Sequence, residues 1–268
     1  MVVAGPIGNP DDITLRALRT LGEVDRVAAE DTRVAARLLA HHGLGKPIES
    51  YHDHNEESRA PALVARMLAG DTIALLTDAG TPLVSDPGYR LVKACVDAGV
   101  AVEVLPGPCA AITALTGAAL PVDRFHFLGF LPRDPRPLLA EVAGWVGTLV
   151  AYESPIRLPG TLELLAEVWP NRRVVVARNL TKLHEQWLRG TAAEVRSALA
   201  DETRGEVTLL VEGHDDTPSP VDLDAEIDRL LHAGVDPRRI RDELAARTGL
   251  PRRDIYARVL NRRTLAER

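Results

Sequence analysis

Cysteine is scarce in this sequence, and long apolar runs are missing. Cys95 and Cys109 are the only cysteines among 268 residues, which is too few for a disulfide framework or a cysteine-ligated zinc site. No stretch approaches the roughly 20 apolar residues that cross a bilayer, and no charged segment followed by an apolar one opens the chain. The sequence therefore predicts a cytoplasmic protein without membrane contact.

Three motifs of common enzyme classes are also missing. The glycines of Gly5–Pro10 do not fit the dinucleotide fingerprint G-x-G-x-x-G, and neither the phosphate loop G-x-x-x-x-G-K-[ST] nor the nucleophile elbow G-x-S-x-G occurs. These absences disfavour nicotinamide-dependent dehydrogenases, nucleoside triphosphatases and serine hydrolases.

The charge that is present is unevenly distributed. The chain is 46% hydrophobic and 26% charged, as in ordinary globular proteins, and its net charge is −6. Residues 237–268 hold ten arginines against four carboxylates, a net charge of +6, which leaves −12 for the rest. This asymmetry indicates a basic appendage on an acidic body. The appendage is either a solvated helical cap or a small nucleic-acid-binding bundle resembling a helix-turn-helix.

The first half of the chain alternates apolar strands with amphipathic helices. Strands are predicted at Val2–Ala4, Val24–Ala29, Thr72–Leu76 and Val100–Leu105, and helices at Ile13–Leu21, Thr32–His42, Ser58–Ala69, Pro87–Ala98 and Pro108–Ala118. Asp11 or Asp12 is expected to cap the first helix, Asp31 the second, and Asp86 the one that starts at Pro87. Such alternation predicts a mostly parallel sheet with helices on both faces.

The second half is less regular. Strands are predicted at Thr148–Tyr152, Arg173–Ala177 and Glu206–Val211, a helix at Pro155–Trp169, and three tail helices near Asp222–His232, Pro237–Thr248 and Pro251–Arg263. Gly117–Pro121 is interpreted as a domain joint and Thr217–Pro220 as a linker. We therefore predict an α/β fold of two domains, residues 1–118 and 119–216, followed by a small helical extension, residues 217–268.

Two stiff loops stand out. Thr77–Tyr89 follows a buried strand and combines two carboxylates, two glycines and two prolines, and Leu105–Ala111 ends the next strand with a similar Pro-Gly-Pro turn. Open α/β sheets bind ligands at the carboxyl ends of their strands. Side by side, these loops predict a small-molecule site.

Four polar segments are further candidates for a site. They are Ala29–Arg33, Tyr51–Glu57, Tyr152–Arg157 and Arg178–Lys182. The histidines and carboxylates of Tyr51–Glu57 lack the spacing of a zinc site, so a polar loop that contacts substrate or a partner subunit is favoured there and no metal is predicted.

Taken together, several strings resemble those of the ribosomal RNA small subunit methyltransferase I family. They are Gly5–Asn9, Ala29–Arg33, His52–Glu56, Asp78–Tyr89, Leu105–Leu115, Gly129–Pro132 and Tyr152–Pro155, in order between Val2 and His214. The resemblance implies a tetrapyrrole-methylase-like fold, S-adenosylmethionine as methyl donor, a homodimer, and 2′-O-methylation of a cytidine in the decoding region of 16S rRNA.

The resemblance also implies which residues bind the donor. These are Pro6 in the first loop, Asp78, Ala79, Gly80 and Thr81 in the second, Pro106, Gly107, Ala110 and Ala111 in the third, and Tyr152, Glu153 and Leu180 from the second domain. Asn179 departs from the family pattern, because an acidic residue is usual there.

Methyl transfer to a ribose hydroxyl gains from a base that removes the proton. The candidates are Glu30, Asp31 and Glu153, followed by His52 and Lys182. RNA contacts are expected from Arg33, His52, Arg133, Arg157, Lys182, Arg238, Arg239, Arg252 and Arg253, with no role for DNA.

Two other functions stay open at this point. One is methylation of a tetrapyrrole carbon by the same fold, although the arginine-rich tail and His52–Glu56 favour RNA. The other is a non-catalytic RNA-binding assembly factor, although the intact glycine loops favour an enzyme.

Overall fold

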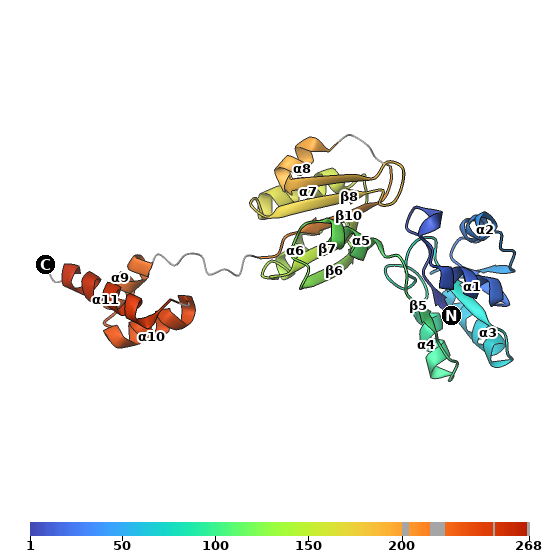
Figure 1. Ribbon diagram of the computed structural model, residues 1–268, viewed down its shortest axis with the longest axis horizontal. Helices are drawn as coiled ribbons and strands as arrows, with labels where there is room; N and C mark the ends of the chain where they lie inside the picture. Colours follow the sequence, from blue (N-terminus) through green and yellow to red (C-terminus); the bar gives the residue numbers. More distant parts are fainter. Residues whose placement is uncertain (200–203, 215–222, 249, 267–268) are drawn as a thin grey trace. The chain divides into compact units, whose positions relative to one another are not determined.

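The computed structural model describes residues 1–199, 204–214, 223–248 and 250–266 (Figure 1). Contacts divide the chain into two compact units, Met1–Gly213 and His214–Arg268. Within the described ranges, no helix has both the length and the apolar character needed to cross a bilayer. The predicted α/β fold with helices at its C-terminal end is confirmed. The three-part division at residues 118 and 216 stays a prediction, because both predicted α/β domains fall in the first unit.

The first sheet is entirely parallel, as the alternating pattern predicts. Its strands are β1 (Val2–Val3), β2 (Arg26–Ala29), β3 (Ile48–Ser50), β4 (Ile73–Leu76) and β5 (Val104–Leu105), in the order β3-β2-β4-β1-β5. Its helices are α1 (Leu15–Glu23), α2 (Thr32–His41), α3 (Glu56–Leu68) and α4 (Tyr89–Asp97). Parallel strands need such crossover helices, because each strand must return to the same edge of the sheet.

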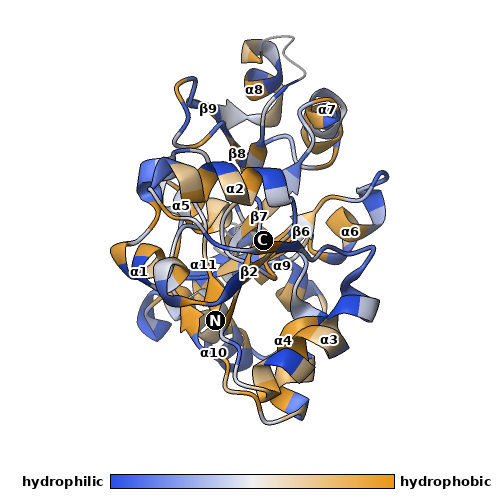
Figure 2. Ribbon diagram, turned by 90° about the vertical axis from the view of Figure 1, so that its right-hand side faces the viewer, coloured by the Kyte–Doolittle hydropathy of each residue, from blue (hydrophilic) through white to orange (hydrophobic). Residues whose placement is uncertain are grey.

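Helices cover both faces of this sheet, since successive side chains of a strand point to opposite sides. Ala74 and Leu76 of β4 pack in one core with residues of α1 and α2, whereas Ile73 and Leu75 pack in another with residues of α3 and α4. Hydrophobic and hydrophilic residues alternate along these helices (Figure 2), as expected for helices with one buried face.

Two of the predicted helix caps are wrong. Thr14, rather than Asp11 or Asp12, caps α1, because Pro10–Asp12 forms a short 3-10 turn of its own, η1. Helix α4 begins at Tyr89 after Gly88, whose φ of 135° breaks the helical path, so Asp86 lies in the preceding loop. The Asp31 cap of α2 is confirmed by a 2.8 Å bond from the Arg33 amide.

The second sheet is mixed. Its strands are β6 (Phe125–Phe130), β7 (Thr148–Glu153), β8 (Arg173–Arg178), β9 (Gln186–Thr191) and β10 (Val207–Val211), in the order β6-β7-β10-β8-β9. Only β6 and β7 run parallel, and the other neighbours are antiparallel. The three predicted strands are the central ones. Sequence reasoning missed β6 and β9, because these edge strands are only partly buried and lack a continuous apolar run.

Helices α6 (Arg136–Glu141), α7 (Leu158–Val168) and α8 (Ala192–Ala198) complete the second half of the unit. Helix α5 (Ala110–Gly117) packs on the second sheet: its Ala111, Ala114 and Leu115 share an apolar core with Val150 of β7 and Leu210 of β10. The same core includes Ile7 from the loop after β1, so this loop packs against the second half of the unit.

The second unit consists of α9 (Leu223–His232), α10 (Pro237–Thr248) and α11 (Arg252–Ala266), close to the predicted bounds. Its core is built from Leu223, Ile227, Leu230, Ile240, Leu244, Ile255 and Val259. Leu260 of α11 lies outside this core and is exposed. The predicted linker Thr217–Pro220 lies outside the described residues.

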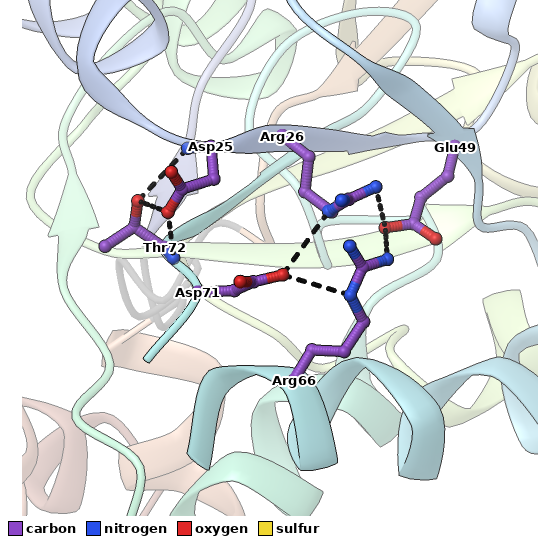
Figure 3. A network of polar contacts seen from close by, with 6 residues as sticks. All are labelled: Asp25, Arg26, Glu49, Arg66, Asp71 and Thr72. Atoms are coloured by element: carbon purple, nitrogen blue, oxygen red, sulfur yellow. Dashed lines mark hydrogen bonds and ion pairs between the residues drawn. The ribbon is translucent and has the colours of Figure 1, made fainter. Parts of the chain in front are cut away.

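Opposite charges alternate at the amino ends of β2, β3 and β4 (Figure 3). Arg26 lies 3.6 Å from Glu49 and 3.7 Å from Asp71, while Arg66 of α3 lies 3.4 Å and 3.0 Å from the same two carboxylates. The Asp25 carboxylate accepts hydrogen bonds of 2.7 Å from both the amide and the hydroxyl of Thr72. These contacts close the end of the sheet opposite the predicted site.

Candidate functional site

Three loops meet at the carboxyl ends of β4, β1 and β5, which are neighbours in the sheet. The Gly5 amide donates to the Gly80 carbonyl at 2.8 Å, and the Gly80 amide donates to the Pro6 carbonyl at 3.2 Å. The Thr81 hydroxyl donates to the Pro108 carbonyl at 2.9 Å. The structure thus joins the two predicted stiff loops to the first loop.

The backbone of these loops leaves little room for side chains at its glycines and adopts left-handed conformations. Gly80 has a φ of +74°, and a Cβ there would lie 3.3 Å from a methyl of Ile7. A Cβ on Gly107 would lie 2.6 Å from that of Ala4. Leu83 and Ser85 also have left-handed φ values, 71° and 66°. Backbone strain of this kind persists where the surrounding structure enforces it, and it gathers at functional sites.

A cavity of about 360 Å³ lies between these loops and the second sheet. It is lined by Ile7, Ala79, Gly80, Thr81, Val84, Ser85, Asp86 and Ala110 from the first half of the unit, and by Phe130, Tyr152, Glu153, Ser154, Pro155, Ala177, Leu180, Gly205, Glu206, Val207 and Thr208 from the second. Its volume lies in the usual range for small-molecule sites.

Aromatic side chains form part of the second wall. The Tyr152 ring lies 5.1 Å from Phe127 and 5.3 Å from Phe130 between ring centres. The Tyr152 hydroxyl accepts a 3.2 Å bond from the Ala111 amide, and burial, then Cys109, raises its pKa. Phe130 is 63% exposed and lines the cavity, so one face of its ring is open to a ligand.

The loop after β8 supplies another part of this wall. Asn179 and Thr181 have left-handed φ values of 50° and 64°, so four of the five non-glycine residues with such values in the described chain lie in loops around the cavity. The Asn179 side-chain oxygen accepts from the Glu206 amide at 3.2 Å. Asparagine tolerates this conformation. Leu180 is buried between the two strained residues.

Glu153 is fully engaged within the protein. Its side chain is 1% exposed and accepts from the Ser154 amide at 2.6 Å and the Thr161 hydroxyl at 2.7 Å. Arg157 pairs with it at 2.6 Å and also donates to the Leu131 carbonyl at 2.9 Å. Glu153 and Arg157 therefore brace the cavity wall, and neither side chain is free for a proton or a phosphate.

Carboxylates crowd the carboxyl ends of β2, β3 and β4. Asp78 accepts a 2.9 Å bond from the Asp31 amide, which ties the second loop to Ala29–Arg33. Hydrogen bonds from Arg33 lower the pKa of Asp31, whereas burial and then the Asp78 charge raise that of Glu30. Asp31 is thus a weak base that is already paired, and Glu30 does not line the cavity.

Asp86 is one of the cavity residues that sequence reasoning missed, and the one that carries an unpaired charge within the described chain. Its half-buried carboxyl group has no hydrogen bond or ion pair with any described residue. Burial, followed by the charges of Glu30, Asp78 and Asp53, raises its pKa to about 7. The Asp-Pro pair suggested a helix start, but the glycine directly after it was a signal for a turn.

Six of the predicted donor-binding residues line the cavity together with Glu153: Ala79, Gly80, Thr81, Ala110, Tyr152 and Leu180. The others lie next to it. The Pro6 carbonyl accepts a hydrogen bond from the Gly80 amide, and the Asp78 carboxylate accepts one from the Asp31 amide. Ala111 is buried, and its amide donates to the Tyr152 hydroxyl. Pro106 and Gly107 are exposed at the end of β5.

The predicted RNA-binding residues fall into two groups. Arg33 pairs with Asp31 at 2.5 Å, Lys182 with Glu206 at 2.9 Å and Arg252 with Asp242 at 3.4 Å, and the His52 ring is half-buried. The other group comprises Arg133, Arg238, Arg239 and Arg253, which are exposed and have no ion pair with any described residue. Across the described ranges, no group of three or more potential ligands is placed to hold a metal.

Comparison with known proteins places this geometry in a family. Residues 1–196 match the model of the Tetrapyrrole (Corrin/Porphyrin) Methylases. Among curated proteins, the chain is 41% identical to "Ribosomal RNA small subunit methyltransferase I" of Halalkalibacterium halodurans, covering 95% of this chain and 92% of that protein. It is 44% identical to the protein of the same name from Micromonospora olivasterospora, covering 96% and 85%.

Solved structures show the same fold at lower identity. Uroporphyrin-III-C-methyltransferase from Thermus thermophilus is 24% identical, with a TM-score of 0.58 over 78% of this chain and 91% of that one. A second structure of that enzyme, solved with S-adenosyl homocysteine, is 22% identical and has a TM-score of 0.57 over 78% and 95%. Diphthine synthase reaches 0.60 at 16% identity, over 77% and 87%.

Proposed function

Because this chain belongs to the tetrapyrrole methylases and, within them, to the ribosomal RNA small subunit methyltransferase I family, we propose that it methylates the RNA of the small ribosomal subunit. The chain is a methyltransferase, and its methyl donor is S-adenosylmethionine. One observation carries the proposal: the loops that bear the family resemblance meet around a single cavity.

The cavity fits the proposed donor. Ala79, Gly80 and Ala110 are small enough to let an adenine ring approach the backbone. Asp86 and the nearby carboxylates Glu30 and Asp78 create a negative field that suits a sulfonium cation. Holding two reactants in a fixed geometry supplies about 7–11 kcal/mol of a reaction barrier, and the interlocked loops provide that rigidity.

The acceptor that we propose is the 2′-hydroxyl of a cytidine in the decoding region of 16S rRNA. A base that is splayed out of its helix is read by stacking on aromatic side chains, and the open face of Phe130 offers such a surface beside the cavity. Arg133 follows Phe130 closely in the chain and is free to contact phosphate.

The arginines of the second unit support an RNA partner. Arg238 and Arg239 begin α10, and Arg253 lies in the first turn of α11. All three are exposed and unpaired within the described chain, whereas Arg241 of α10 pairs with Asp242 at 2.8 Å. Cations that are not neutralised internally are the ones that can release counterions from an RNA backbone.

We also propose that the protein is a homodimer, as the resemblance implies. The edge strand β6 supports this, because it exposes Phe125 next to Val122, Trp145 and Val146. Exposed apolar groups along an unpaired strand are typical of a contact surface. Light scattering of the full chain is expected to give twice the 29.0 kDa of one chain; the mass of a single chain would contradict the dimer.

The decisive experiment is methyl transfer from labelled S-adenosylmethionine to small subunits that lack this modification, followed by mapping of the labelled nucleotide. We expect label on the ribose of one cytidine. Label on a tetrapyrrole, with none on RNA, would favour the other function of this fold. Normal RNA binding with no binding of S-adenosylmethionine in calorimetry would favour a non-catalytic assembly factor.

The role of the second unit is tested by the salt dependence of RNA affinity. Replacing Arg238 and Arg239 with Ala removes two phosphate contacts, so the slope of log affinity against log salt should fall by about 0.7 for each on single-stranded RNA. Arg241→Ala on the same helix is the matched control and should change the slope less, because Asp242 already neutralises Arg241. Equal slopes for all variants would assign RNA binding to the first unit.

A further inference from the structure

The cavity contains one carboxylate that the fold leaves without a partner. Among the described residues, three acidic side chains line it, namely Asp86, Glu153 and Glu206. Glu153 is buried and bound by three donors, and Glu206 pairs with Lys182 at 2.9 Å. Asp86 has no hydrogen bond or ion pair with any described residue, although it lies on the wall of the cavity.

From this arrangement we propose that Asp86 is the general base that removes the proton from the ribose hydroxyl during methyl transfer. The inference rests on the proposed function, because it assigns a step of that reaction. As the new O–C bond forms, the methyl carbon's bond to sulfur breaks with its electron pair, and the sulfur becomes neutral. The hydroxyl proton passes to the Asp86 carboxylate, so charge and atoms balance.

The surroundings of Asp86 adapt it to this role. Glu30 after β2, Asp53 after β3 and Asp78 after β4 repel its negative charge, and the phenol of Tyr152 faces it from β7. Burial, followed by the charges of Glu30, Asp78 and Asp53, raises the pKa of Asp86 to about 7. A base whose pKa lies near the operating pH combines a large ionised fraction with a strong pull on the proton.

The other candidate bases lack one of these properties. Asp31 is held by Arg33, and Lys182 by Glu206. Neither Glu30 nor His52 lines the cavity. The negative charge of Glu30 acts instead on Asp86, because it helps to raise the pKa of the Asp86 carboxyl group. Glu30 is therefore a positioning residue in this scheme.

The test is the pH dependence of kcat/KM for S-adenosylmethionine at saturating small subunits, because this ratio reports pKa values before the cationic donor binds. In the wild type the ratio should fall as the pH drops below about 7, since protonated Asp86 accepts no proton. Asp86→Asn should lower this ratio by about 100-fold or more and remove this acid limb. Calorimetry with S-adenosylhomocysteine, whose sulfur is uncharged, should show retained binding and thus a folded cavity.

Two further variants separate the base from its neighbours. Glu30→Gln removes a repelling charge, so the acid limb should move to lower pH while Asp86 still works. Glu206→Gln, which alters a paired carboxylate of the same cavity, should leave the position of the limb unchanged. If Asp86 had only a structural role, Asp86→Asn would keep the acid limb of the pH profile and Glu30→Gln would not shift it.

The outcomes distinguish the two proposals. An active wild type, together with an Asp86→Asn variant of similar kcat/KM and the same acid limb, overturns the base and leaves the proposed function standing. A wild type that labels no small-subunit RNA overturns the proposed function and the base with it.

Discussion

At the amino ends of β2, β3 and β4, Arg26 and Arg66 lie between Glu49 and Asp71, so each charge has opposite neighbours (Figure 3). The carboxyl ends of the same strands are followed by Glu30, Asp53 and Asp78, and their like charges act together on Asp86. Charged side chains therefore gather at both ends of one sheet, but they attract each other at one end and repel at the other.

This difference in charge assigns different roles to the two ends of the sheet: the amino end contributes to stability, and the carboxyl end to ligand binding. Exposed and half-exposed ion pairs contribute modestly to stability, and this contribution is enough to explain the charges at the amino end. Crowded carboxylates destabilise the fold, and here they surround Asp86, which lines the cavity that we propose for the cationic donor. Functional sites commonly retain groups that reduce stability. We expect changes at the carboxyl end to affect ligands and changes at the amino end to affect unfolding.

The largest expected effect is at Gly80. Gly80→Arg places a long side chain in the cavity, so affinity for S-adenosylmethionine should fall by 100-fold or more in calorimetry. Gly43→Arg is the matched control, because Gly43 has a similar φ of +68° and no atom within 4 Å of an added Cβ. Both variants share the backbone strain, and only the first blocks the site. Unchanged affinity in Gly80→Arg would show that the donor binds elsewhere.

The next effect concerns stability at the carboxyl end. Because folding raises the pKa of Asp86 from 3.8 to about 7, the folded state binds more protons and loses stability as pH rises from about 4 to 7. Asp86→Asn removes this loss. After allowance for solvent screening, we expect the variant to gain about 1–2 kcal/mol in free energy of unfolding at pH 8. At pH 4 the two proteins should unfold almost alike in urea.

A contrary result would be equally informative. If Asp86→Asn lowers stability at pH 8, Asp86 has a favourable partner in solution, and the carboxyl end resembles the amino end after all. If Asp86→Asn gains stability and loses catalysis, the same carboxylate lowers stability and serves function, as the comparison of the two ends predicts.

The smallest effect is at the amino end. Arg66→Ala removes two ion pairs and should lower the free energy of unfolding by about 0.5–1 kcal/mol, with kcat unchanged. Lys93→Ala, which breaks the more exposed pair with Asp97, is the control and should lower stability less. Since salt screens attraction, 1 M NaCl should reduce the Arg66 effect. A double-mutant cycle with Asp71→Asn measures the pair itself.

Much of the fold could be read from the sequence because its signals are local. The buried run Thr72–Leu76 and the capped helix at Thr32 predicted β4 and α2 closely. The edge strands β6 and β9 could not be read in this way, because their stability comes from pairing with β7 and β8 rather than from their own apolar content. Asp86 was misassigned for a similar reason, since Asp-Pro predicts a cap unless the backbone at Gly88 is known.

The sequence by itself determined the alternation of strands and helices, the basic tail and the loops that identify the family, because each depends on residue type and short spacing. Only the tertiary structure decided which polar side chains remain without a partner. The sequence alone does not show which of the two carboxylates, Glu153 or Asp86, is bound by other side chains. Thr161 and Arg157 engage one, whereas Glu30, Asp53 and Asp78 surround the other, and those neighbours come together only when distant strands pair in one sheet.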